Sequence, residues 1–257
     1  MFIDTHTHLY LEDFDKDREE ILNRCAQSGV QKLLLPNIDN STLPSVKKLA
    51  LDHPEVCYAM NGLHPCYVKG NVEEALNDIK EDFEKYDYIG VGEIGIDFYW
   101  DTTWAEEQIY AFKQQIAWST EIGIPFVIHS RSALDLTIRI VGDAECHADQ
   151  CIFHCFDGTI DQANKIIDLG MKMGIGGPIT YKKSKLIEVI KNIDLKHIVL
   201  ETDSPYLTPS PHRGERNEST YIPLIAKRIA EIKEITVEEV AELTTENSKA
   251  IFKKIDL

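Results

Sequence analysis

The sequence lacks any apolar run that approaches the about 20 residues needed to cross a bilayer. Its first residues also lack the basic segment and the longer apolar segment that together make a signal peptide. We therefore expect a cytoplasmic protein with no membrane partner. Hydrophobic residues nevertheless make up 43% of the 257 residues, which is enough to build one large α/β core.

Positive charge is scarce. The chain has 27 Lys and Arg residues against 43 Asp and Glu residues, so its formal net charge is −16. This balance argues against broad electrostatic adhesion to nucleic acid or to an anionic membrane. It does not exclude a locally positive site, because a formal count of charges omits bound metal ions.

Closely paired cysteines are absent as well, since none of the 6 cysteines belongs to a C-x-x-C motif. In a cytosolic chain of this size we expect thiols and no disulfides. One alternative is a zinc site made by Cys146 and His147 with Cys151 and Cys155. Thiolate zinc sites usually show tighter paired spacing, so we favour the first interpretation.

Internal repeats, low-complexity segments and shifts of composition are also missing, which predicts one domain over residues 1–257. Within it, apolar β-branched runs alternate with amphipathic stretches. The strand-like runs are Met1–His8, Lys32–Asn37, Val56–Leu63, Tyr88–Glu93, Pro125–His129, Cys151–Cys155, Met171–Ile175 and Ile198–Asp203. The helix-like stretches are Lys16–Ser28, Leu43–Leu51, Val72–Tyr86, Thr103–Ile122, Ala133–Val141, Ile160–Leu169, Lys185–Asn192, Asn217–Lys233 and Val237–Lys254.

Strict alternation of strand and helix indicates a parallel sheet covered by helices. Eight such units in a chain of this length predict an α/β fold of the closed (β/α)8 TIM barrel type. Gly29, Gly123 and Gly170 follow three of the helices as C-terminal caps, and Thr236 with Glu239 forms a capping box. An open doubly wound sheet is the alternative, but no Gly-rich dinucleotide fingerprint follows the first strand.

Titratable residues stand at the ends of most of these strands. His6 and His8 are one residue apart, so on an extended chain their side chains point the same way. The other strand ends carry His64, Glu93, His129, His154 and Asp203. A single histidine at such a place is more often structural, but the joint pattern predicts a metal site at the catalytic end of a barrel.

The types of ligand indicate the chemistry. Four histidines with Glu93 and Asp203 can hold one or two divalent ions, and a carboxylate can bridge two of them. Neither a thiolate cluster nor an open redox facial triad is evident, which favours hydrolysis over redox chemistry.

The chain resembles the TatD-type metal-dependent deoxyribonucleases, a family of amidohydrolase-like barrels, over essentially its whole length. The matching segments are Asp4-Thr5-His6-Thr7-His8, Gly62-Leu63-His64-Pro65, Gly92-Glu93-Ile94-Gly95-Ile96-Asp97, His129-Ser130-Arg131, His154-Cys155-Phe156, Glu201-Thr202-Asp203-Ser204-Pro205-Tyr206-Leu207 and Arg213-Gly214-Glu215-Arg216-Asn217.

This resemblance implies a TIM barrel of the metallo-dependent hydrolase type that holds two divalent ions, which can be Mg²⁺, Mn²⁺ or Zn²⁺. It implies a hydrolase that cleaves phosphodiester bonds of DNA, with 3′–5′ exonuclease action on single-stranded ends as one form. It implies no obligate protein partner. The implied ligands of one metal are His6, His8, Glu93 and Asp203, and those of the second are Glu93, His129 and His154.

Other roles also follow from the resemblance. Asp203 doubles as the base that orients the attacking water, and His64 lies near the metals to contact phosphate or assist the leaving group. Arg131, Arg213 and Asn217 line the mouth and bind the substrate.

Two other functions stay open. The acidic net charge suits a metal-dependent esterase or amidase, or an aminoacyl-nucleic acid deacylase, on the same barrel. A non-catalytic metal-loaded binding protein is the third hypothesis.

Three further features have two interpretations each. Phe98, Tyr99 and Trp100 either stack on unpaired bases or pack onto the barrel rim. Lys182, Lys183 and Lys185 either form a basic rim or begin a solvated helix. Glu201 is expected to orient a metal ligand and not to be one.

Overall fold

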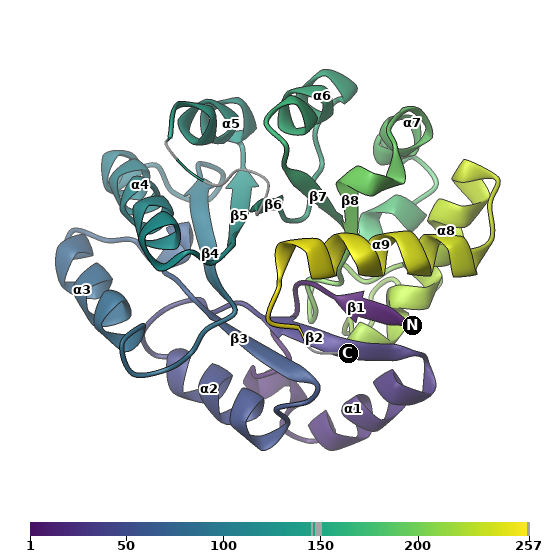
Figure 1. Ribbon diagram of the computed structural model, residues 1–257, viewed down its shortest axis with the longest axis horizontal. Helices are drawn as coiled ribbons and strands as arrows, with labels where there is room; N and C mark the ends of the chain where they lie inside the picture. The colour runs from purple at the N-terminus through teal and green to yellow at the C-terminus, as the bar shows by residue number, and fades with distance from the viewer. Residues whose placement is uncertain (145, 147–150, 256–257) are drawn as a thin grey trace.

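The computed structural model describes residues 1–144, 146 and 151–255. Eight strands form one sheet in which every neighbouring pair is parallel and the spatial order follows the chain order. The strands are β1 Phe2–Asp4, β2 Val30–Leu35, β3 Cys57–Asn61, β4 Gly90–Asp97, β5 Phe126–Arg131, β6 Cys151–Phe153, β7 Lys172–Ile175 and β8 Ile198–Leu200. They lie at the centre of a ring of helices (Figure 1).

Hydrogen bonds between the first and last strands close the sheet into a barrel. The backbone N–H of Thr5 donates to the carbonyl oxygen of Leu200 at 3.0 Å, and the N–H of Asp203 donates to the carbonyl of His6 at 2.9 Å. A further bridge joins Thr7 to Ser204. The predicted (β/α)8 barrel is therefore confirmed.

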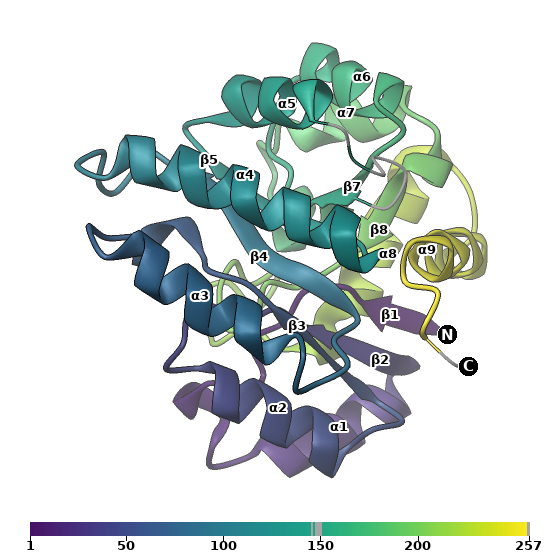
Figure 2. The ribbon, with the colours of Figure 1, turned by 60° about the vertical axis from the view of Figure 1, so that its left-hand side comes forward.

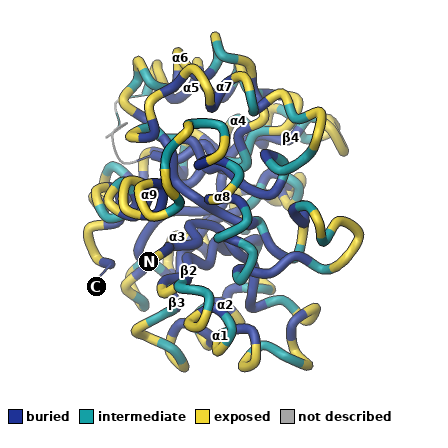
Figure 3. The backbone as a smooth tube through the Cα atoms, turned by 90° about the vertical axis from the view of Figure 1, so that its right-hand side faces the viewer, coloured by how far each residue is buried: buried dark blue, intermediate teal, exposed yellow. Residues whose placement is uncertain are grey.

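Helices follow the strands and cover the outside of the barrel (Figure 2). They are α1 Arg18–Gln27, α2 Leu43–Asp52, α3 Val72–Asp82, α4 Ala105–Ile122, α5 Leu134–Asp143, α6 Ile160–Asp168, α7 Leu186–Asn192, α8 Ile222–Lys233 and α9 Val237–Ile251. Their inner faces are buried and their outer faces exposed, as Figure 3 shows. Among the described residues, no helix is long and apolar enough to cross a membrane.

Local chemistry sets where several helices begin and end. Thr236 and Glu239 form the predicted capping box of α9, with the Glu239 N–H donating to Thr236 Oγ1 at 3.1 Å. Gly123 follows α4 with φ of 77°, a left-handed conformation that glycine adopts without strain. The six cysteines are all described and form no disulfide. His147 of the alternative zinc site lies outside the described residues.

The N-terminal end of the barrel is filled by side chains of the strands and of the chain's last turns. These buried residues form one apolar cluster: Ile3, Leu34, Met60, Ile89, Val127, Ile152, Val199, Ile251, Phe252 and Ile255. The last three come from the end of α9 and the residues after it. Because all the strands are parallel, their C-terminal ends, which carry the polar residues, lie together at the opposite end of the barrel.

Candidate metal centre

Glu93, near the middle of β4, lies at the centre of the predicted site, and its side chain is only 3% exposed. Its two carboxylate oxygens face different histidines. Oε2 lies 3.2 Å from His6 Nε2 and 3.7 Å from His8 Nε2. Oε1 lies 2.8 Å from both His129 Nδ1 and His154 Nε2. Each carboxylate oxygen thus faces its own pair of imidazoles, an arrangement suited to a bridging ligand, while the His6 and His154 rings of the two pairs stack with centroids 3.8 Å apart.

Asp203 joins the first of these groups. Its Oδ1 is 3.8 Å from His6 Nε2 and 3.5 Å from His8 Nε2. The residue follows β8 with φ of 55°, so the backbone turns there and directs the carboxylate into the barrel mouth. β1 itself ends at Asp4, earlier than the sequence pattern predicts. The bridge at Thr7 nevertheless keeps His6 and His8 on the same side.

Outer hydrogen bonds fix the tautomers of two of these imidazoles, His8 and His129. Tyr10 Oη donates to the carbonyl of Pro36 at 2.7 Å, so the same hydroxyl accepts from His8 Nδ1 at 2.8 Å. The unprotonated Nε2 of His8 therefore faces the centre, as a metal ligand must.

Asp97, four residues after Glu93, fixes the tautomer of His129 in the same way. Its Oδ2 accepts from His129 Nε2 at 2.9 Å, which directs Nδ1 towards Glu93. The sequence analysis does not include Asp97 among the predicted site residues. Its even spacing from Glu93 on one strand could have indicated it, because side chains at even spacing face the same side of a strand. Glu201 is placed as expected, because its Oε1 lies 3.5 Å from His154 Nδ1 and accepts the backbone N–H of Cys155 at 2.5 Å.

Burial and neighbouring charges shift the pKa values of the residues at the centre. Burial raises the pKa of Glu93, but the histidines around it, His154 first, outweigh burial and hold that pKa well below its usual value. Burial likewise raises the pKa of Asp203, and a hydrogen bond from His8 together with the charges of nearby histidines lowers it overall. Burial lowers the pKa of His6. Nearby carboxylates outweigh burial at two other histidines: they raise the pKa of His129, and they raise that of His154 well above its usual value. The centre therefore pairs ionised carboxylates with imidazoles.

This set of donors fits divalent cations. Both ring nitrogens of His6 are buried and have no hydrogen-bond partner, which is costly for a polar group in a protein interior. Three overlapping groups have ligand atoms within 4.8 Å of one another: His6, His8 and Asp203; His6, Glu93 and His154; His64, Glu93 and His129. A cation among them would supply the missing partner of His6 Nε2, the nitrogen that faces Glu93 and Asp203.

His64, after β3, lies at the edge of the second group. Its Nε2 is 3.2 Å from His129 Nδ1 and 3.5 Å from Glu93 Oε1. Its Nδ1 accepts the backbone N–H of Cys66 at 3.1 Å, so the proton of the neutral ring is on Nε2. Burial lowers the pKa of His64 to about 3. A neutral ring with N–H directed inward is a hydrogen-bond donor to the centre and not a ligand in this tautomer.

The three residues expected at the mouth differ in position. Arg131 is exposed, and its guanidinium carbon lies 3.8 Å from the centroid of the Tyr99 ring. Arg213 is exposed above the Tyr181 ring at 4.0 Å.

Asn217 does not line the mouth, contrary to the sequence-based expectation. It is fully buried, and its Nδ2 donates to the carbonyl oxygens of Thr202 and Tyr206. These bonds hold the loop that carries Asp203, because a buried carboxamide must find partners in the backbone around it.

A parallel barrel with buried imidazoles and carboxylates gathered at its C-terminal end defines a metal-dependent hydrolase. The family model described as "TatD related DNase" matches residues 3–253, and the chain belongs to this family. It is 36% identical to an uncharacterized metal-dependent hydrolase of Bacillus subtilis (strain 168), YabD, over 98% of this chain and 99% of that protein.

Two further relatives extend the comparison. A protein of Pantoea ananatis named 3′-5′ ssDNA/RNA exonuclease TatD is 28% identical over 97% of this chain and 98% of its own length. The crystal structure of the TatD homologue YjjV of Escherichia coli K12 superimposes with a TM-score of 0.91 at 29% identity, covering 98% of each chain.

Proposed function

We propose that this metal-dependent hydrolase cleaves phosphodiester bonds of nucleic acid, with single-stranded DNA ends as the substrate and two divalent ions as cofactors. The observation that carries the proposal is the division of the centre by Glu93, whose Oε2 faces His6 and His8 while Oε1 faces His129 and His154. Two ions about 3.5–4 Å apart are the arrangement used in many phosphodiester hydrolases.

The surroundings of the centre support a phosphate substrate. Arg131 and Arg213 are exposed cations on a chain whose net charge is −16; Arg131 is the last residue of β5, and Arg213 lies on the segment that follows β8. Relatives named as exonucleases on single-stranded DNA and RNA share the full length of the chain.

Each residue of the centre has its own part in this reaction. His6, His8, Glu93 and Asp203 would hold one ion, and Glu93, His129 and His154 the other. Bound divalent ions lower the pKa of water and neutralise charge on phosphate. Asp203 accepts the proton of the attacking water and orients it. His64 donates its Nε2–H to a phosphate oxygen, and the two arginines hold the neighbouring phosphates.

A timed digest of end-labelled single- and double-stranded oligonucleotides across a series of Mg²⁺, Mn²⁺ and Zn²⁺ tests the proposal. We expect shortening of the single strand from one end. Glu93→Gln and Asp203→Asn should lower the rate by more than the about 10–100-fold typical of an outer partner of a metal ligand. Glu84→Gln, an exposed carboxylate on the barrel's outside, is the matched control.

A panel of esters, amides and aminoacyl-nucleic acids run beside the digest distinguishes the other hydrolytic hypothesis. Turnover of an ester or amide that far exceeds phosphodiester turnover would reject the proposal. Unchanged digestion by both carboxylate variants would reject it as well.

A further inference from the structure

Exposed aromatic side chains gather on the loops that surround the candidate metal centre. Tyr67 follows β3, Tyr99 and Trp100 follow β4, and Tyr206 follows β8, with exposed fractions of 49%, 56%, 69% and 52%. Two of them lie against histidines of the centre: Tyr206 is 6.2 Å from His8 and Tyr67 is 6.1 Å from His64 between ring centroids. Exposed rings clustered at one face usually mark a binding surface.

Three of the side chains at this face contact one another and form one cluster, which we call the base platform: Tyr99, Trp100 and Arg131. The Tyr99 and Trp100 rings meet edge to face with centroids 4.9 Å apart. The guanidinium carbon of Arg131 lies 3.8 Å from the centroid of Tyr99 and 5.1 Å from that of Trp100. Such cation–π contacts preorganise long side chains that would otherwise be mobile.

A single carboxylate connects the base platform to the metal centre. Asp97 Oδ2 accepts from His129 Nε2, while its Oδ1 accepts the backbone N–H groups of Tyr99 at 2.9 Å and Trp100 at 3.3 Å. Arg131 lies two residues after His129 on β5. The position of the platform relative to the centre is therefore set by hydrogen bonds and by strand geometry.

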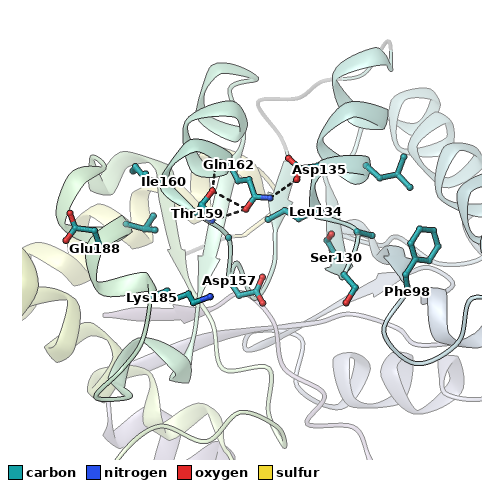
Figure 4. A pocket seen from close by; sticks show the side chains of 15 residues that line it. Phe98, Ser130, Leu134, Asp135, Asp157, Thr159, Ile160, Gln162, Lys185 and Glu188 are labelled. Carbon is teal, nitrogen blue, oxygen red and sulfur yellow. Dashed lines mark hydrogen bonds between the residues drawn. The ribbon is translucent and has the colours of Figure 1, made fainter.

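A cavity of about 760 Å³ adjoins the platform. Phe98 and Ser130, each directly before a platform residue, line one side of it, and Asp157 and Lys185 line the other (Figure 4). Glu188 adds another carboxylate to its lining, so the cavity is unsuited to a phosphate. Its mixed apolar and hydrogen-bonding walls suit a heterocyclic base.

We propose that the base platform binds the unpaired bases of a single-stranded nucleic acid whose scissile phosphate lies at the metal centre. This inference rests on the proposed function and specifies the part of the substrate that the chain recognises outside the reacting bond. Every base has a π face, so stacking on Tyr99 and Trp100 tolerates any sequence. Paired bases are already stacked on both sides, so the platform selects single strands over duplexes.

Binding of two strands that carry the same phosphates tests the inference. One is a decathymidylate with phosphorothioate linkages that resist cleavage, and the other has the same linkages and abasic sugars. The full chain is loaded with Mn²⁺, and affinity is measured by fluorescence anisotropy. We expect Trp100→Ala to weaken binding of the base-bearing strand about tenfold and to leave the abasic strand's affinity as in the wild type.

Matched variants control for damage to the fold. Trp100→Phe should restore most of the affinity for the base-bearing strand. Tyr110→Ala removes an aromatic side chain that is 41% exposed on the outer helix α4, and it should change neither affinity nor strand digestion. Thermal melting of every variant shows whether the fold is kept.

The outcomes separate this inference from the proposed function. If Trp100→Ala binds both strands as the wild type does, the platform inference is wrong even when the protein digests DNA. If the protein digests no phosphodiester but loses base-dependent binding in Trp100→Ala, the proposed function fails and the platform stands. If Trp100→Ala instead converts a dimer into a monomer in sedimentation and leaves strand binding unchanged, the surface is a contact between copies and the inference is overturned.

Discussion

At the scale of single residues, the centre depends on side chains that contact no substrate. Tyr10, Asp97 and Glu201 each face the outer nitrogen of a histidine. Each places an oxygen beside the outer ring nitrogen. This favours a proton on that nitrogen and leaves the inner nitrogen free to bind a cation. Asp97 has the most demanding position, because burial raises its pKa while the hydrogen bond with His129 and those from the loop backbone lower it to about 2.

The substitution Asp97→Asn tests this role. The carbonyl oxygen of the new amide side chain would still accept the N–H groups of Tyr99 and Trp100, but its nitrogen would face His129 Nε2 in place of the acceptor. We expect metal affinity to fall about 10–100-fold. The metal-free protein should also lose some stability, because the hydrogen bond between His129 and the ionised Asp97 is lost. Calorimetric titration with Mn²⁺ measures the first quantity, and an affinity equal to that of the wild type would contradict the assigned role.

Residue patterns, which are local in sequence, predicted that histidines and carboxylates would gather at the strand ends. His6 and His8 follow the strand repeat, and the others each stand at the end of a separate strand-like run. These patterns did not predict Tyr10 as the partner of His8, because that bond depends on Pro36, 26 residues further along the chain. The same limit explains Asn217. Its burial results from the course of the loop after β8, and this course is set by contacts between residues distant in sequence.

At the scale of elements, α9 acts as the seal of the barrel. Phe252 directly follows it and is fully buried among the strand residues of the N-terminal end. The capping box that begins α9 was predictable from the sequence, whereas the docking of its far end under the strands was not, since helical periodicity does not specify a partner.

Phe252→Ala should therefore lower the free energy of unfolding by about 3–5 kcal/mol, the cost of a cavity left by a buried aromatic ring. Leu243→Ala on the same helix is the control, because Leu243 is 44% exposed and its loss should cost less than about 0.5 kcal/mol. Urea denaturation measures both. Equal effects of the two substitutions would show that the end of α9 does not seal the barrel.

A second contact between elements makes stability depend on pH. Asp82, the last residue of α3, accepts from Lys47 Nζ at 2.9 Å on α2 and from the hydroxyl of Tyr88 before β4. Burial raises the pKa of Asp82, but these hydrogen bonds outweigh burial and lower it. A carboxylate with a lowered folded pKa contributes stability above its unfolded pKa of 3.8, and this contribution is lost as the pH falls through the folded value.

Asp82→Asn should then destabilise the protein by about 1.5–3 kcal/mol near neutral pH, the range for hydrogen bonds to a charged group. The difference from the wild type should shrink as the pH falls below 3.8. The midpoints of urea denaturation, measured between pH 7 and pH 3, report this difference. Glu74→Gln, on the exposed side of α3, is the control. A difference that stays constant over this interval would show that Asp82 carries no such charge.

At the scale of the whole molecule, the candidate centre draws its ligands from β4 and β5 and from the segments that follow β1, β6 and β8. A metal that binds only this assembled set binds the folded state and not the unfolded chain. Metal binding therefore stabilises the entire barrel by mass action.

Removal of divalent ions with a chelator should lower the melting temperature, and adding them back should restore it. At a metal concentration 100 times the Kd the gain is about 2.7 kcal/mol, which for a chain of this size corresponds to about 5–10 °C. In the Glu93→Gln variant, adding or removing divalent ions should no longer change the melting temperature. A wild-type melting temperature indifferent to every divalent metal would argue against the centre itself.

The closure of the barrel also determines when the candidate metal centre can be completed during synthesis of the chain. His6 and His8 are synthesised early. Asp203 is added, and the hydrogen bonds that join β1 to Leu200 can form, only after most of the chain has been synthesised. A nascent chain still attached to its ribosome and messenger RNA therefore carries an incomplete centre for most of its synthesis.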